Sequence, residues 1–139
     1  MRRVSLLFLG LSLLYSAFLS SLQGATVTWV GGSGDWSTPA NWSTGVVPGS
    51  GDDVVVPAGP AITVTHSSGT HSVHSLQSQQ ALVLSGGTLG VSSLLVAGNN
   101  LTLSGATLQS ATLVATNGFV PALQGGTLDG VTVAAGSTA

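Results

Sequence analysis

The second half of the chain repeats at a short, nearly constant period. The segment Leu82–Leu89 returns as Leu101–Leu108 and again, weakened, as Leu123–Leu128, with matching leucines 19 and then 20 residues apart. Within each unit, apolar residues alternate with Ser, Thr or Gly, a pattern typical of short strands separated by turns. Self-similarity at such a period, with strands in every unit, indicates a solenoid. We predict an all-β chain that folds as a right-handed parallel β-helix (β-solenoid) with about 19–20 residues per coil.

Stacking is required because a single coil of this size cannot bury enough apolar surface to fold alone. An earlier, degenerate unit begins near Ile62 and ends near Leu76. Two inward columns are predicted, one of Leu84, Leu103 and Leu123 and the other of Leu89, Leu108 and Leu128.

The N-terminus has the layout of a secretory signal peptide. Arg2 and Arg3 precede an apolar run, and small residues follow at Gly24 and Ala25, where we expect cleavage. An uncleaved anchor is the alternative, since residues 4–22 are nearly long enough to span a bilayer. The predicted organisation is therefore a signal peptide (1–25), a Trp-rich N-terminal cap (26–60) and solenoid repeats (61–139). We expect the repeats to be truncated at the C-terminal end.

Charged residues make up only 4% of the chain, against about 25% in ordinary globular proteins. Both cations are Arg2 and Arg3, and all four acids are Asp. After cleavage no Lys or Arg would be left to bind phosphates, so we predict neither a nucleic-acid partner nor phosphoryl transfer. With no cysteine, the chain must be stabilised by packing rather than by disulfides.

All three tryptophans lie in one segment near the start. Its pattern is Trp-x-Gly-Gly-x-Gly-x-Trp from Trp29, then Asn-Trp at Trp42, then Pro-Gly-x-Gly-Asp-Asp-Val from Pro48. This stretch of about 30 residues resembles the segment that opens many bacterial autotransporter passengers and other large β-helical surface proteins. The resemblance implies a surface or adhesin-like β-solenoid, and it implies no catalytic residues.

Two interpretations of Trp29, Trp36 and Trp42 are open. They either cover the first coil as a cap, which would protect its edge from pairing with other chains, or form a platform on which a glycan stacks. We favour the cap, because three aromatic residues beside a coil of small residues are suitable material for a lid.

Two polar groups are weaker candidates. Asp52 and Asp53 nearly fit a calcium-binding nonapeptide, but such sites form between tandem copies and one copy is present; the alternative is a turn in which Asp caps backbone amides. His66, His71 and His74 either converge on a metal or lie in a solvated, Ser-rich coil, which is our expectation. We predict no cofactor.

The function predicted from these features is that of an exported, non-enzymatic structural or adhesin-like surface protein. Its expected partners are extracellular glycans or neighbouring solenoid repeats, with no membrane contact after signal cleavage. One alternative is a carbohydrate-binding module that uses the tryptophans; a weaker one is the non-catalytic start of a polysaccharide-degrading β-helix enzyme. We predict no enzyme, because glycoside hydrolysis needs two carboxyl groups about 5–9.5 Å apart and Asp129 is the one acid within the repeats.

Overall fold

A computed structural model describes residues 24–134 of the 139-residue chain. The predicted signal peptide, and the anchor that is its alternative, fall on residues 1–23 and so lie outside the described residues. Between residues 24 and 134, no helix has the length and apolar character needed to cross a membrane.

Short strands account for the regular structure in the described range, with one turn of 3-10 helix, η1 (Pro39–Asn41). The strands are β1 (Thr26–Thr28), β2 (Gly34–Asp35), β3 (Asp53–Val56), β4 (Thr63–His66), β5 (Thr70–Val73), β6 (Ser75–Ser78), β7 (Ala81–Leu84), β8 (Thr88–Val91), β9 (Leu94–Ala97), β10 (Leu101–Gln109), β11 (Thr112–Ala115), β12 (Ala122–Asp129) and β13 (Thr132–Val133).

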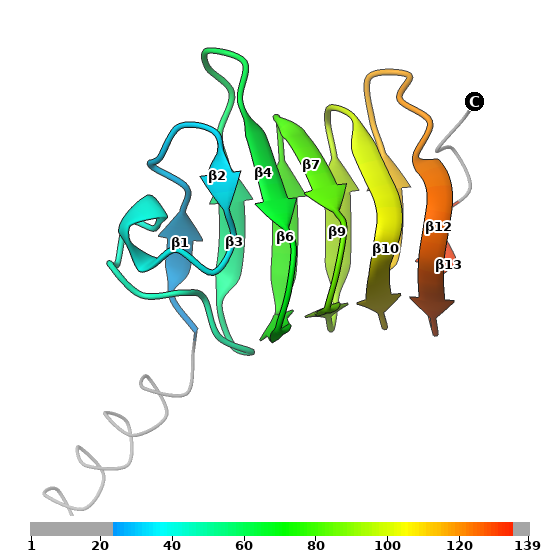
Figure 1. Cartoon of the computed structure of the whole chain (residues 1–139), viewed down its shortest axis with the longest axis horizontal. Coiled ribbons are helices and arrows are strands. Elements are labelled where there is room, and N and C mark those ends of the chain that lie inside the picture. The colour runs from blue at the N-terminus through cyan, green and yellow to red at the C-terminus, as the bar shows by residue number, and fades with distance from the viewer. Residues whose placement is uncertain (1–23, 135–139) are drawn as a thin grey trace, which may run out of the picture.

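The strands pair in parallel and stack into a solenoid (Figure 1). One sheet runs β1-β3-β6-β9-β11-β13, and every neighbouring pair in it is separated along the chain by a whole coil. The other strands form a second, continuous set in which β10 bends: its first part pairs with β7 and its second part with β8. Each full coil therefore has three sides. The parallel β-helix predicted from the repeat is confirmed.

The predicted leucine columns have the expected register. Leu103 pairs with Leu84 on one side and with Leu123 on the other, and Leu108 likewise pairs with Leu89 and Leu128. Strand alternation turns these leucines inward, and the four in the middle coils are at most 3% exposed. Leu123 and Leu128, on the last long strand, are 59% and 39% exposed, so the columns continue in register there but are not buried.

Glycines recur at the corner between two sides because neighbouring coils approach there too closely for a side chain. A Cβ at Gly87, whose φ is +69°, would overlap the carbonyl oxygen of Gly69 in the preceding coil. At Gly105 a Cβ would lie 2.6 Å from the Ser85 oxygen. The corner explains why Gly returns with the repeat period.

The Trp-rich segment forms the first, incomplete coil of the solenoid. β1 pairs with β3 and β2 pairs with β4, so residues 26–60 already contribute strands to both sets. The chain then loops through η1 and returns along the outer edge of β1. There Ser43 N donates to Thr28 O at 2.8 Å, Thr28 N donates to Ser43 Oγ at 3.0 Å, and Val30 N donates to Asn41 O at 2.8 Å.

Candidate functional site

The three tryptophans form one cluster inside the N-terminal coil. The Trp42 ring lies 4.8 Å from Trp29 and 4.8 Å from Trp36, measured between ring centroids, in edge-to-face arrangements. Their exposed fractions are 2%, 2% and 0%. Trp42 Nε1 donates to Trp36 O at 2.8 Å and Trp29 Nε1 to Gly32 O at 3.0 Å, whereas Trp36 Nε1 is buried without a partner. The cluster packs as core.

This packing bears on the two interpretations of the tryptophans. Stacking on a sugar needs an exposed aromatic face, and these rings have none to offer as they stand. Trp29 does line the wall of a shallow depression of about 340 Å³, together with Pro57, Pro60 and Ile62. The amide of Gln80, which also lines it, is occupied: it donates to Pro57 O and accepts from Ile62 N. Glycan binding by the tryptophans stays a prediction, and the geometry favours packing.

Two of the three histidines contradict the expectation of a solvated coil. His66 is fully buried and His71 is partly buried, while His74 is exposed. The register explains the error: His66 pairs with Leu84 and His71 with Leu89, so both occupy inward column positions one coil before the leucines. The same repeat spacing, extended one unit backwards, would have found them.

His66 lies between an indole and a second imidazole. Its ring centroid is 6.1 Å from that of Trp36 and 5.0 Å from that of His71. His66 Nδ1 lies 2.8 Å from Gly86 O, and His66 Nε2 lies 2.9 Å from His71 Nδ1. The side-chain chemistry of this end is therefore enclosed, and we call His66 and His71 the histidine pair.

Asp35 lies at the edge of this cluster and holds a turn. Its Oδ1 accepts from the backbone and the hydroxyl of Ser37, and its Oδ2 accepts from the Ser67 hydroxyl at 2.5 Å. Partial burial raises the pKa of Asp35, but the hydrogen bonds from Ser37 and Ser67 outweigh it and hold that pKa below its usual 3.8.

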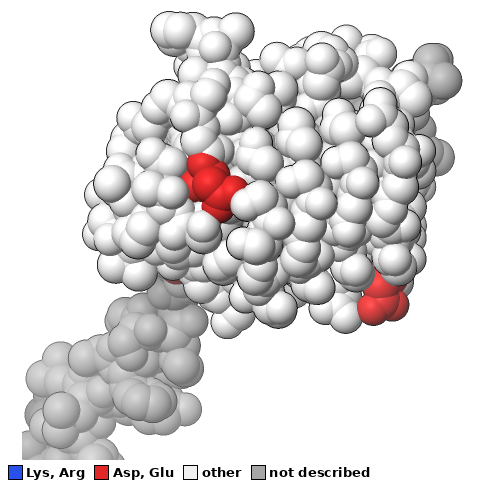
Figure 2. Space-filling view, in the orientation of Figure 1, with Lys and Arg blue, Asp and Glu red and all other residues white. Residues whose placement is uncertain are grey.

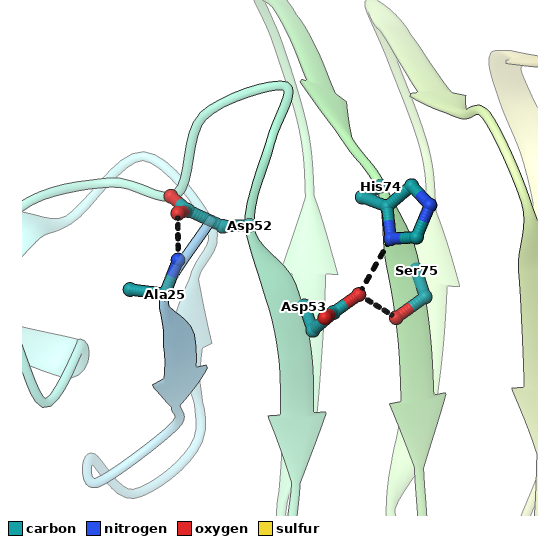
Figure 3. Close-up of polar contacts among 5 residues, drawn as sticks. All are labelled: Ala25, Asp52, Asp53, His74 and Ser75. Carbon is teal, nitrogen blue, oxygen red and sulfur yellow. Dashed lines mark hydrogen bonds and ion pairs between the residues drawn. The ribbon is translucent and has the colours of Figure 1, made fainter. Parts of the chain in front are cut away.

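Asp52 and Asp53, the calcium candidates, are neighbours in sequence but engage different partners (Figure 3). Asp52 accepts from Ala25 N at 3.0 Å and from Gly49 N at 2.8 Å, so it caps backbone amides as the alternative interpretation expected. Asp53, on β3, accepts from the Ser75 hydroxyl at 2.5 Å and lies 2.8 Å from His74 Nδ1. Hydrogen bonds from Ser75 and then His74 lower the pKa of Asp53. In residues 24–134 no three His or Asp side chains are grouped so that they could hold a metal ion.

Asp53, His74 and Ser75 are the residue types of a catalytic triad, but they are connected differently. In a triad the imidazole lies between carboxylate and hydroxyl and takes the hydroxyl proton. Here the carboxylate lies between the other two, because Asp53 Oδ1 is the atom that both Ser75 Oγ and His74 Nδ1 contact. The Ser75 hydroxyl donates to a carboxylate and has no adjacent base. The arrangement ties β3 to β6 and activates no nucleophile.

The visible outer surface is almost uncharged (Figure 2). Residues 24–134 contain four Asp and no Lys, Arg or Glu. Asp129 accepts from Gln109 Nε2 at 2.9 Å. One outward row is built of threonines in register on four successive coils: Thr70, Thr88, Thr107 and Thr127. We call these residues the threonine row.

Comparison with known proteins adds no relative to this picture. No protein-family model, no curated protein and no solved structure matches the chain.

Proposed function

We propose that the chain is an exported, non-enzymatic structural or adhesin-like surface protein that presents the outside of its solenoid. The observation that carries this proposal is the threonine row on an almost uncharged surface. Parallel strands repeat at about 4.8 Å, so the row sets hydroxyl groups at a regular spacing along the axis. Many weak hydrogen bonds made together can hold a glycan or a neighbouring solenoid.

The side chains that titrate are used for structure, which supports a non-enzymatic role. Asp35 and Asp52 cap backbone amides, and Asp53 and Asp129 accept from side chains of neighbouring coils. A general acid or base must reach the substrate, whereas His66 is enclosed in the core. Export is proposed from the first 25 residues of the sequence.

Adhesion is tested by placing a bulky cation on the threonine row. The double variant Thr88→Lys/Thr107→Lys, compared with wild type on a glycan array and on coated beads offered to cells, is expected to lose binding. The matched control is Gln77→Lys, which changes an exposed residue on a different side, β6, and is expected to keep it. Equal binding by both variants would contradict the role of the row.

The enzymatic alternative is tested on the same preparations. Turnover of pectin, alginate, xylan or peptide substrates, with or without calcium, that disappears in Asp53→Ala or His74→Ala would replace the structural proposal with an enzymatic one. The carbohydrate-binding alternative is tested with Trp36→Ala: loss of glycan binding at an unchanged melting temperature would support it, and loss of folding would support the packing role. Secreted product whose intact mass still includes Met1 would contradict signal cleavage.

A further inference from the structure

The hydrogen bonds of the histidine pair define where its protons lie. His66 Nδ1 is 2.8 Å from Gly86 O, and a carbonyl oxygen only accepts, so this nitrogen carries a hydrogen. His66 Nε2 and His71 Nδ1 are 2.9 Å apart, a distance at which a single hydrogen lies between them. With both rings neutral, His71 Nδ1 donates to His66 Nε2.

Counting protons shows that the pair accommodates one added proton but not two. A first proton goes to the free nitrogen of His71, and the contact between the rings still holds one hydrogen. A second proton must go to His66 Nε2, which then faces the N–H of His71 across 2.9 Å. The hydrogen bond is lost, and two positive charges lie on rings whose centroids are 5.0 Å apart.

The surroundings offer little to compensate these charges. Asp35, on β2, is the charged side chain among the described residues that acts on the pair, and its oxygens are already occupied by Ser37 and Ser67. The inward residues that pair with His66 and His71 from β7 and β8 are Leu84 and Leu89. Burial lowers the pKa of His71, a charged His66 lowers it further, and Asp35 acts in the opposite direction.

We propose that the histidine pair is an acid-operated latch that holds the N-terminal coil on the second coil. Above the range in which the pair takes a second proton, His71 closes over His66, and His66 supports Trp36 from below. When the second proton binds, His71, the partly exposed member, moves into solvent. His66 then loses one of its two hydrogen bonds, and the packing of Trp36 loosens.

The sign of the pH effect follows from the lowered pKa of His71. An imidazole in the unfolded chain titrates near 6.5. Because the native state binds its proton less readily, the stabilisation is fully present above pH 6.5 and is lost as the pH falls toward the native pKa. The Asp residues titrate near or below 3.8, so the window between pH 7.5 and 4.5 isolates the histidines.

The first test follows tryptophan fluorescence and melting temperature across that window. The folded wild-type chain is expected to show a fluorescence transition and a fall in Tm of about 3 °C or more. In His71→Gln, which keeps a hydrogen-bonding group but not the titration, both should disappear. The control His74→Gln changes the exposed histidine that contacts Asp53, outside the latch, and should retain both. A wild-type protein without the transition, or a transition that persists in His71→Gln, would overturn the proposal.

The second test needs no variant and so does not depend on whether His71→Gln folds. Imidazole ¹⁵N resonances of the wild-type chain at pH 7.5 should show both His66 and His71 protonated on Nδ1 and not on Nε2. On acidification the His71 signals should shift first to those of an exposed imidazolium, together with loss of the protected His66 Nδ1 hydrogen. Independent titration of the two rings, each with an unperturbed midpoint, would contradict the shared proton.

Discussion

The first and last coils of the described solenoid occupy equivalent positions but are covered very differently. At the N-terminal end, residues 41–43 return along β1 and satisfy its outer backbone groups, and the inward positions hold tryptophans and histidines that are largely buried. At the other end, β12 and β13 turn Leu123, Leu128 and Val133 inward in register, yet these side chains are 59%, 39% and 56% exposed.

The difference shows that register and burial are separate properties of a solenoid. Register is set by pairing with one neighbouring coil, which both ends possess. Burial needs a layer on each side, because a leucine in a column is covered by the residues above and below it. At the N-terminal end that layer comes from large rings carried by a loop, which fill the space that one more coil would occupy.

The largest expected effect of a single change lies in this ring layer. Trp42→Ala removes the indole that contacts both Trp29 and Trp36 and donates to Trp36 O. We expect a loss of about 3–5 kcal/mol in the free energy of unfolding, the range for a buried Trp replaced by Ala. Denaturant unfolding measures it. A loss below about 1 kcal/mol would show that the cluster is not part of the folded core.

The two ends of one leucine column provide the next comparison. Leu84→Ala, at a fully buried position, should cost about 2–5 kcal/mol. Leu123→Ala, in register in the same column but 59% exposed, should cost no more than about 0.5 kcal/mol. Chemical denaturation of both variants gives the difference directly. Equal costs would mean that the last coil is covered in solution.

A smaller effect is expected where Asp52 holds the start of β1. Asp52→Ala removes acceptors for Ala25 N and Gly49 N, and we expect a loss of about 1 kcal/mol. Amide hydrogen exchange should become faster in β1 and stay unchanged in β11. The matched control is Asp129→Ala at the other end, which removes one exposed contact with Gln109 and should change stability by less than about 0.5 kcal/mol.

The smallest effect is the acid limb of the stability profile. The pKa of Asp35 is below 3.8 in the folded chain, so its contribution is present above that pH and is lost as the pH falls further. Asp35→Asn should therefore flatten the decline in stability between pH 4 and pH 2.5, measured by thermal unfolding. An unchanged slope would show that the contacts with Ser37 and Ser67 are not maintained in solution.

The sequence predicted the solenoid well because its signal is local and repeated. Alternation in Leu82–Leu84 determines which side chains point inward, and the recurrence at Leu101–Leu103 determines which strands pair. The capping role of Asp52 was also accessible as one of two interpretations, since Asp in a Gly-rich turn commonly accepts from backbone amides.

The histidines were misplaced because their neighbours in sequence differ from their neighbours in space. Ser, Thr and Gly surround His66 and His71 along the chain and suggested water. In the fold, each pairs with a leucine of the following coil, and Trp36 comes from the preceding one. The connection among Asp53, His74 and Ser75 was likewise not visible, since β3 and β6 meet only after a full coil.

By itself the sequence determined the coil length, the parallel class of the fold, the leucine columns and the near absence of charge. These are one-dimensional properties, because a strand alternates with period two and a solenoid repeats its coil. Only the tertiary structure decided which polar side chains are enclosed, which acids cap, and which end is covered. An inward position becomes buried or exposed according to the coil that lies against it, and that neighbour comes from a distant part of the chain.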